Sequence, residues 1–173
     1  LLSNAYFHSQ TIRYIKLAPR YFPIIEPILK EKGIPDDFKY LALAESGLNP
    51  RAVSPAGAVG FWQIMEGTDK EYGLEINEYV DERLDIEKST HAAARYLKAM
   101  RKKLRNWTNV AVSYNRGING FKRAQKKQKA IDFYDLRMNE ETSRYIFRII
   151  ALKEIMSKPK KYILSIDQGT TSS

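Results

Sequence analysis

Residues 40–65 have the sequence YLALAESGLNPRAVSPAGAVGFWQIM, and this stretch decides the fold. Its first apolar residues share one helical face with Glu45, and Gly47 stands where a helix C-cap belongs. Residues 49–60 are too rich in Pro, Gly and Ala to form a regular element. The pattern therefore predicts a buried helix whose last turn presents a carboxylate to a compact, glycine-rich loop.

Glu45 is the candidate catalytic acid of this stretch. The C-terminal end of a helix carries partial negative charge, which disfavours a carboxylate. Burial against apolar groups also disfavours the charged form, so both effects should raise the pKa of Glu45. A raised pKa would help to keep the group protonated near neutral pH, as a general acid requires. The alternative is a solvent-facing glutamate at a helix end.

The composition points to one domain without a metal or a cofactor. A chain of 173 residues is long enough to bury a core of its own. It contains no cysteine, which excludes disulfides and thiolate ligands, and its two histidines, His8 and His91, share no ligand spacing. No apolar run approaches the roughly 20 residues that span a bilayer. No export signal is visible at the N-terminus.

The net charge of +9 is concentrated in three basic runs of the second half, at residues 101–105, 122–129 and 157–161. One interpretation is that these runs are solvated helix faces. The other is attraction to a polyanion, either a nucleic acid or an acidic cell-wall polymer. Charge alone does not choose between these interpretations.

Hydrophobic periodicity and helix-end signals predict a series of helices, with no convincing strand before Tyr162. Pro27 should kink the first helix, Gly33 should end it, and Asp85 should cap the longest one. The expected helical segments are 19–32, a helix opened by residues 35–37 that runs to Glu45, 61–66, a short turn with a capping box at 68–71, 86–105, 107–115, 119–129, and a last helix from residue 139 or 140 that Pro159 ends. The core stripe expected on the last helix is Tyr145, Ile146, Ile149, Ile150 and Met156.

Three short motifs occur in order along the chain. The first is Glu45-Ser46 followed by AVS at 52–54, GAVG at 57–60 and Gln63; the second is SYNRG at 113–117; the third is ETSRY at 141–145. Together they resemble the signature of the soluble lytic transglycosylases (SLT), although Ser113 stands where that family has Ala. Trp62 and the Asp-Glu-Arg segment at 81–83 make the chain most similar to the membrane-bound murein transglycosylase D branch, from about residue 13 to 162.

This resemblance implies a mainly α, lysozyme-like fold of the goose type over residues 1–162, with a substrate cleft and little or no β-sheet. It implies a peptidoglycan lytic transglycosylase, which cleaves the β-1,4 bond between N-acetylmuramic acid and N-acetylglucosamine without water and leaves 1,6-anhydromuramic ends. Glu45 would act as acid and then as base; residues 46–65 contain no Asp or Glu, which fits a single-glutamate mechanism. A hydrolytic muramidase and a non-catalytic peptidoglycan-binding module are the alternatives.

The resemblance also assigns substrate-binding roles within the loop that follows Glu45. Ser54 would bond the N-acetyl group of muramic acid, and the alternative is a turn closed by its own hydroxyl. Gln63 would bind sugar, and the alternative is an amide satisfied by the backbone. Met65 would pack under the sugar, and the alternative is a core methionine.

The second and third motifs supply the remaining candidates. Tyr114 would approach the reacting centre and steady either the developing positive charge or Glu45, while Asn115 would hold local structure. Glu141 and Tyr145 would line the cleft, although Glu141 fits equally well as a first-turn acid of the last helix. Ser46 would cap the helix end and not touch substrate.

The implied partner is the peptidoglycan strand, and the implied location is the periplasmic side of a bacterial cell envelope. Membrane association would come only through parts absent from this chain. No nucleic acid is expected as a partner, because no nucleic-acid-binding motif accompanies the basic runs. Residues 163–173 lie outside the pattern; with Tyr162 they read YILSIDQGTTSS and resemble the opening strand and phosphate-binding turn of sugar kinases. Twelve residues cannot form such a site alone, so we assign this tail no function.

Overall fold

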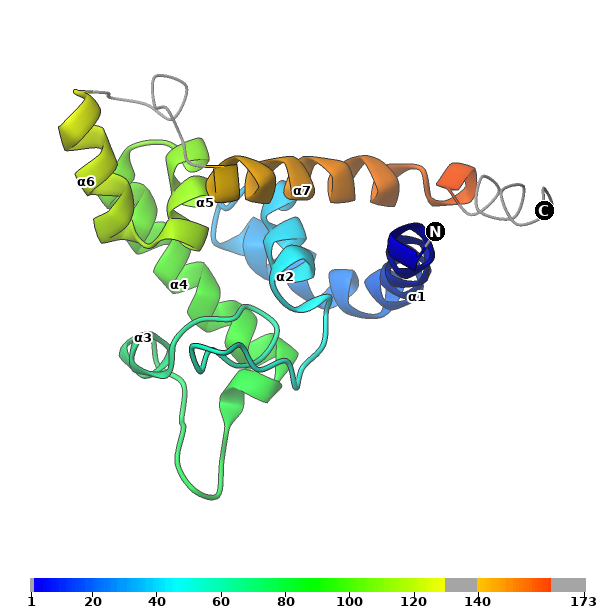
Figure 1. Cartoon of the computed structure of the whole chain (residues 1–173). Coiled ribbons are helices and arrows are strands. Elements are labelled where there is room, and N and C mark those ends of the chain that lie inside the picture. The colour runs from blue at the N-terminus through cyan, green and yellow to red at the C-terminus, as the bar shows by residue number, and fades with distance from the viewer. Residues whose placement is uncertain (1, 130–139, 163–173) are drawn as a thin grey trace.

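The computed structural model describes residues 2–129 and 140–162, with the side chains of residues 9–129, 140 and 142–162. Within these ranges the chain is helical and has only isolated β-bridges, which confirms the predicted mainly α fold. Figure 1 shows α7 running across α2 towards the N-terminal part of α1. The elements in chain order are α1 (Leu2–Glu31), the 3-10 turn η1 (Asp36–Phe38), α2 (Lys39–Ser46), α3 (Glu66–Glu71), the 3-10 turn η2 (Glu82–Leu84), α4 (Ile86–Leu104), α5 (Trp107–Arg116), α6 (Ile118–Gln128) and α7 (Glu140–Ser157).

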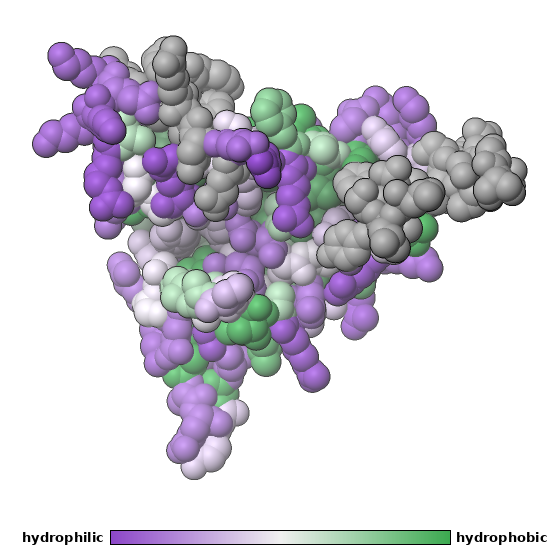
Figure 2. Space-filling view, in the orientation of Figure 1, coloured by the Kyte–Doolittle hydropathy of each residue, from purple (hydrophilic) through white to green (hydrophobic). Residues whose placement is uncertain are grey.

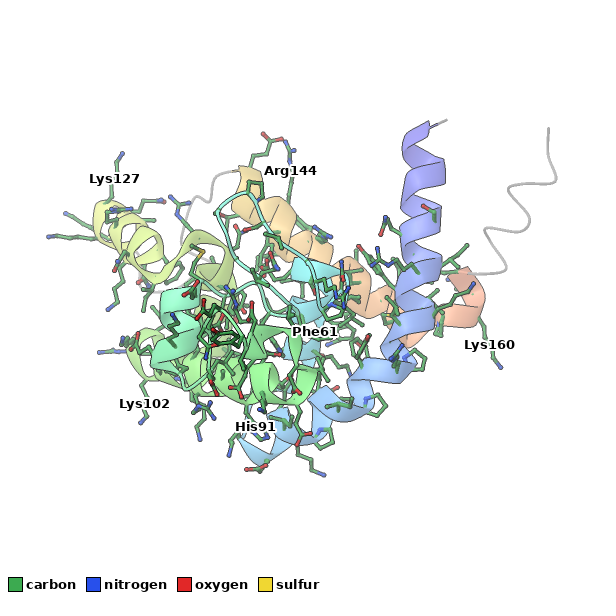
Figure 3. The ribbon with its side chains drawn as sticks, turned by 90° about the horizontal axis from the view of Figure 1, so that it is seen from below. Phe61, His91, Lys102, Lys127, Arg144 and Lys160 are labelled. Carbon is green, nitrogen blue, oxygen red and sulfur yellow. The ribbon has the colours of Figure 1, made fainter. Side chains whose placement is uncertain are left out.

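Helix α1 begins at Leu2, well before the expected start at residue 19, and contains three prolines, at 19, 23 and 27. Each proline lacks an N–H and leaves a carbonyl of the preceding turn without its helical partner. The three prolines follow one another at helical spacing and are all exposed, so water can satisfy these carbonyls. Figure 3 shows that the helix changes direction in this part. Gly33, at φ +66, ends it as predicted.

Helix α2 is buried on every side and not only on the predicted face. Its residues 41–44, Leu-Ala-Leu-Ala, are each at most 3% exposed. The helix packs against α1 and α7, and the two alanines permit close approach of those neighbours. A helix that is apolar all round belongs in the interior, and α2 lies there between α1 and α7.

The segment 61–66 is not a helix, and that prediction was wrong. Gly60 at φ +83 and Gln63 at φ +49 place left-handed residues where a helix would need right-handed ones, and Ile64 pairs with Val59 in an antiparallel bridge. Helix α3 begins only at Glu66, with Met65 as its N-cap. Residue 68 therefore lies inside the first turn, and the predicted capping box is also wrong.

The helices after residue 85 agree closely with the predicted segments. Asp85 caps α4 by accepting the N–H of Lys88 at 2.8 Å, and α5 ends before Gly117. Helix α7 ends at Ser157, before Pro159. Its core stripe is rotated from the predicted one, because Leu152 and Ile155 are buried and Ile150 is 56% exposed. The predicted connector at 132–136 and the tail at 163–173 lie outside the described residues.

The basic runs lie largely on the surface. Figure 2 shows hydrophilic side chains standing out where α6 lies in Figure 1. The lysines at 102, 103, 122, 126 and 127 are all exposed, as the solvated-face interpretation requires. Along residues 2–129 and 140–162, none of the helices has both the length and the apolar character needed to cross a membrane.

Gly60 offers a direct test of the loop that precedes α3. A Cβ added at Gly60 would lie 2.3 Å from the carbonyl oxygen of Arg83, and the residue has φ +83. We predict that Gly60→Ala lowers the free energy of unfolding by about 2–3 kcal/mol, measured by urea denaturation. Gly67→Ala is the matched control, because nothing lies within 4 Å of its Cβ position in helix α3. An equal loss in both variants would contradict this packing.

Candidate active site

The chain turns sharply after Glu45, at the end of α2. Gly47 caps the helix at φ +61, and its N–H donates to the carbonyl of Leu43 at 2.9 Å. A Cβ at Gly47 would lie 2.8 Å from the ring of Tyr14, so only glycine permits this approach of α1. Leu48 is also left-handed, at φ +58, and is fully buried. This turn holds Glu45 at the boundary between the core and the following loop.

Glu45 is half-buried and accepts a hydrogen bond from the hydroxyl of Tyr145, at 2.6 Å to Oε1. Burial raises the pKa of Glu45 above its ordinary value, and this is the largest effect on the group. The hydrogen bond from Tyr145 and the positive charge of Arg148 lower the pKa, but less than burial raises it. The net direction agrees with the prediction from the sequence, and the solvent-facing alternative is wrong.

Tyr114 lies near Glu45, but its hydroxyl serves another group. It donates to the backbone carbonyl of Trp62 at 2.6 Å and so ties α5 to the loop before α3. Burial raises the pKa of Tyr114 well above its ordinary value, and the negative charge of Glu45 adds to this. The tyrosine that bonds Glu45 is Tyr145. Sequence reasoning named Tyr145 as a core residue of the last helix and as a cleft residue, and missed this contact.

The polar side chains of the loop hold its backbone. The Ser46 hydroxyl lies 3.0 Å from the carbonyl of Ala42 and 2.9 Å from that of Phe61. The Ser54 oxygen accepts the N–H of Ala58 at 3.0 Å. Ser54 therefore closes a turn with its own hydroxyl, which is the alternative to sugar binding that the sequence left open. The Gln63 amide nitrogen donates to two loop carbonyls, Ala52 at 2.9 Å and Gly60 at 2.8 Å. A sugar could still meet the hydroxyl hydrogen of Ser54 and the amide oxygen of Gln63.

The remaining candidates differ in their surroundings. Met65 is 49% exposed, so it is not a core methionine and its side chain is accessible to a ligand. Asn115 is exposed at the end of α5. The side chain of Glu141 lies outside the described residues. The structure therefore brings Tyr145 and Tyr114 to Glu45 and leaves the substrate contacts of the other residues as predictions.

Sequence reasoning also missed a second buried carboxyl. Asp69 on α3 is 4% exposed, and burial raises its pKa to about 7, with a smaller opposing effect from Arg83. The guanidinium of Arg83 is held by Asp81 through bonds of 2.8 and 2.7 Å. No pattern in the sequence indicated Asp69, because it lies inside the segment interpreted as a capping box. Across the described residues, no three His, Cys, Asp or Glu side chains gather as metal ligands would.

The helical fold, with a half-buried glutamate at the end of the interior helix α2, has the lysozyme-like form. The chain belongs to the transglycosylase SLT domain family, whose model matches residues 22–136. It is 32% identical over 167 residues to membrane-bound lytic murein transglycosylase D of Escherichia coli K12. That alignment covers 94% of this chain and 36% of the relative, so the chain spans about a third of the relative's length.

Solved structures support the same fold. An inactive mutant of the lytic transglycosylase Slt from Pseudomonas aeruginosa superposes with a TM-score of 0.66 at 18% identity, over 84% of this chain and 26% of that one. The 70 kDa soluble lytic transglycosylase of Escherichia coli gives a TM-score of 0.60 at 22% identity, over 76% and 23% of the two chains. At these identities the likeness concerns the fold alone.

Tyr145→Phe tests the contact at Glu45. In wild type the hydrogen bond from Tyr145 stabilises the carboxylate of Glu45 and lowers its pKa. Without that bond the effect of burial is less opposed, so the pKa of Glu45 should rise further. Carbon-13 NMR titration of the Glu45 carboxyl measures this shift. Tyr79→Phe, at an 87% exposed position, is the control and should leave the titration unchanged. A lower or unaltered pKa in Tyr145→Phe would show that the hydroxyl does not stabilise the carboxylate.

Asp69→Asn tests the second carboxyl through stability. The pKa of Asp69 is about 7 in the folded state and lies above its value in the unfolded chain. The contribution of protonated Asp69 to the free energy of unfolding is therefore fully present below about pH 4. It is lost progressively as the pH rises to about 7. We predict that Asp69→Asn raises the free energy of unfolding above pH 7 by roughly 1–3 kcal/mol and has little effect at pH 4. Urea denaturation of wild type and Asp69→Asn at pH 4 and above pH 7 measures this difference. A difference in the free energy of unfolding that is the same at both pH values would contradict the raised pKa of Asp69.

Proposed function

We propose that this chain is the catalytic domain of a peptidoglycan lytic transglycosylase. It would cleave the β-1,4 bond between N-acetylmuramic acid and N-acetylglucosamine and leave a 1,6-anhydromuramic end. Membership of the SLT family and relatives named as lytic murein transglycosylases support this. The observation that carries the proposal is the raised pKa of the half-buried Glu45, held in place by Tyr145.

In the first step Glu45 gives its proton to the glycosidic oxygen. A general acid works best when its pKa lies near the working pH, and burial moves Glu45 in that direction. The Tyr145 bond to one carboxyl oxygen leaves the other free to face the substrate. The bond between C1 of the muramoyl residue and the leaving oxygen then breaks, and the substrate N-acetyl group assists at C1.

In the second step the ionised Glu45 takes the proton from the muramoyl 6-hydroxyl, whose oxygen bonds to C1. The 1,6-anhydro ring closes, Glu45 regains its proton and no water is consumed. Most glycosidases need a second carboxylate within about 10 Å. Among the described side chains, the groups that shift the pKa of Glu45 are Tyr145 and Arg148 and include no carboxyl, which favours a single-glutamate mechanism.

The other family residues fit binding roles in this scheme. Ser54, through its hydroxyl hydrogen, would bond the N-acetyl group, and Gln63 would accept a sugar hydroxyl through its amide oxygen. The exposed Met65 would pack under a sugar ring. Tyr114 and Asn115, with Tyr145 and Glu141 at the start of α7, would border the substrate. The working domain would comprise residues 1–162 on the periplasmic side of the envelope.

Mass spectrometry of muropeptides released from purified sacculi tests this function. Wild type should release ends lighter by one water than those from a muramidase, and Glu45→Gln should lower the rate at least about a hundredfold. Tyr79→Phe, which removes a hydroxyl at an 87% exposed position, is the control and should release wild-type amounts. Hydrated reducing ends would identify the hydrolytic alternative. Activity in Glu45→Gln equal to that of wild type would exclude Glu45 as the acid. If wild type released no muropeptides, the remaining interpretation would be a non-catalytic peptidoglycan-binding module.

A further inference from the structure

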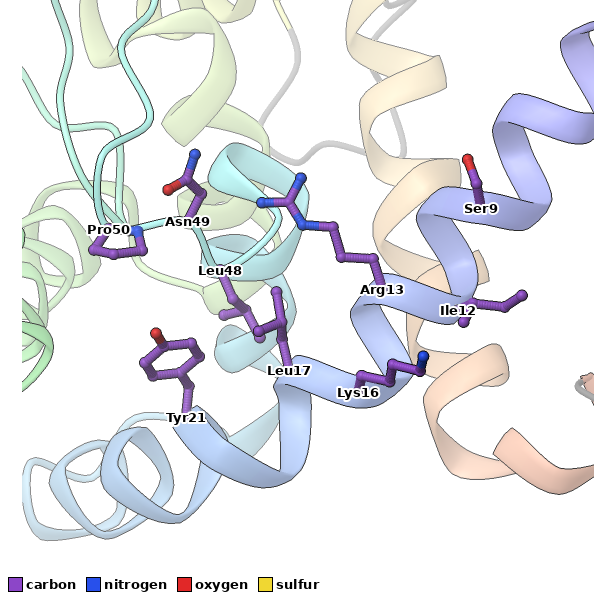
Figure 4. Close-up of a pocket in the computed structure, with 9 residues that line it drawn as sticks. All are labelled: Ser9, Ile12, Arg13, Lys16, Leu17, Tyr21, Leu48, Asn49 and Pro50. Carbon is purple, nitrogen blue, oxygen red and sulfur yellow. The ribbon is translucent and has the colours of Figure 1, made fainter.

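A pocket of about 460 Å³ lies between the N-terminal half of α1 and the residues just after α2. Figure 4 shows Arg13 reaching from α1 towards the loop that carries Asn49, with Leu48 below them in the view and next to Leu17. Lys16 and Tyr21 line the same pocket from α1. None of the residues assigned above to catalysis or sugar binding takes part in it, so the pocket is separate from the proposed sugar contacts.

The polar groups of this pocket favour an anion. Arg13 and Lys16 are exposed, and neither forms an ion pair or hydrogen bond with any residue that the structure describes. The Asn49 side-chain oxygen accepts the N–H of Arg51 at 3.0 Å, so its amide nitrogen remains to donate. No acidic side chain lines the pocket within the described residues. Figure 4 shows the Arg13 guanidinium facing Asn49, while Lys16 extends from α1 in the other direction. The pocket therefore has a cation and an amide donor on one side and a second cation on the other, without a carboxylate to neutralise them.

The pocket is also fixed close to Glu45. Four peptide links separate Glu45 from Asn49, so their Cα atoms lie no more than about 15 Å apart. The left-handed Gly47 and Leu48 fold the chain between them, and Tyr14 of α1 packs against Gly47. The Tyr21 ring packs edge-on against Phe61 at 5.0 Å, which anchors the α1 wall to the loop. A group bound in this pocket would therefore lie close enough to the scissile bond to belong to a short side branch of the same glycan strand.

We propose that this pocket binds the carboxylates of the peptide stem on the muramoyl residue and so selects peptide-bearing glycan strands. The proposal rests on the proposed function, because it needs peptidoglycan at Glu45. In a peptide-bearing strand the lactyl carboxyl of each muramoyl residue is tied up in the amide to the stem, so the sugars carry no charge, whereas the stems carry carboxylates that match Arg13 and Lys16. A stem of three to five residues extends roughly 10–17 Å, which spans the distance from Glu45 to the pocket.

The test compares product release from two preparations of the same strands, one with intact stems and one stripped of stems by an amidase, which leaves only the lactyl carboxylate on each muramoyl residue. Arg13→Gln with Lys16→Gln should lower the preference for peptide-bearing strands about tenfold, through KM and not kcat. Lys102→Gln with Lys127→Gln is the matched control. It removes the same charge on the far side of the molecule from the N-terminal part of α1, as Figure 3 shows, and should leave the preference unchanged.

A second measurement does not depend on catalysis. Glu45→Gln protein, with and without the two pocket changes, is sedimented with each kind of strand. Weaker binding to peptide-bearing strands alone supports the pocket, and unchanged or uniformly weaker binding overturns it. If wild type releases no product from either strand, the proposed function fails, and the binding comparison still decides what the pocket does. Unfolding midpoints equal to wild type exclude a folding defect in the variants.

Discussion

The hydrogen bond from Tyr145 to Glu45 joins residues 100 positions apart, and the site depends on it. It exists because α7 packs across the interior helix α2 and buries Leu152 and Ile155 along the same face as Tyr145. The bond holds the carboxyl in one orientation but favours its ionised form. Burial opposes this and is the larger effect, so Glu45 is oriented while its pKa remains above the ordinary value.

The loop after Glu45 keeps its form without a sheet. Its stability comes from side chains that bond backbone groups, chiefly Ser46, Ser54 and Gln63. Left-handed Leu48 and Gln63 cost about 1–3 kcal/mol each, and such strain persists only where the surroundings fix the conformation. The burial of Leu48 and the two amide bonds of Gln63 supply this fixation. The loop is thus shaped before any substrate binds, which favours catalysis by positioning.

Local signals predicted the parts of the fold that local chemistry controls. Gly47 ends α2 and Asp85 caps α4, because each depends on only a few neighbouring residues. The ordered motifs identified the family and placed Tyr114 near Glu45. The sequence did not reveal which tyrosine bonds the glutamate, because this depends on the rotation of α7 about its axis. The same rotation exposes Ile150, which periodicity alone had placed in the core.

Other errors arose where tertiary contacts override local preference. The segment 61–66 has helical composition, but Gly60 must pass against the Arg83 carbonyl and Trp62 must reach Thr90, to which its ring N–H donates at 3.0 Å. Asp69 looked like an ordinary surface residue of a short helix. It became a buried acid only because α3 packs against α4, a contact that no local pattern announces.

The central claim is that burial outweighs the Tyr145 bond at Glu45, and a carbon-13 NMR titration of wild-type protein tests it most directly. Assignment by comparison with Glu45→Gln isolates the one carboxyl. The structure predicts a midpoint above the ordinary value for glutamate, so that the acid form persists to a higher pH than in an ordinary glutamate. A midpoint at or below that ordinary value would contradict the account, since Glu45 would then have no proton to give.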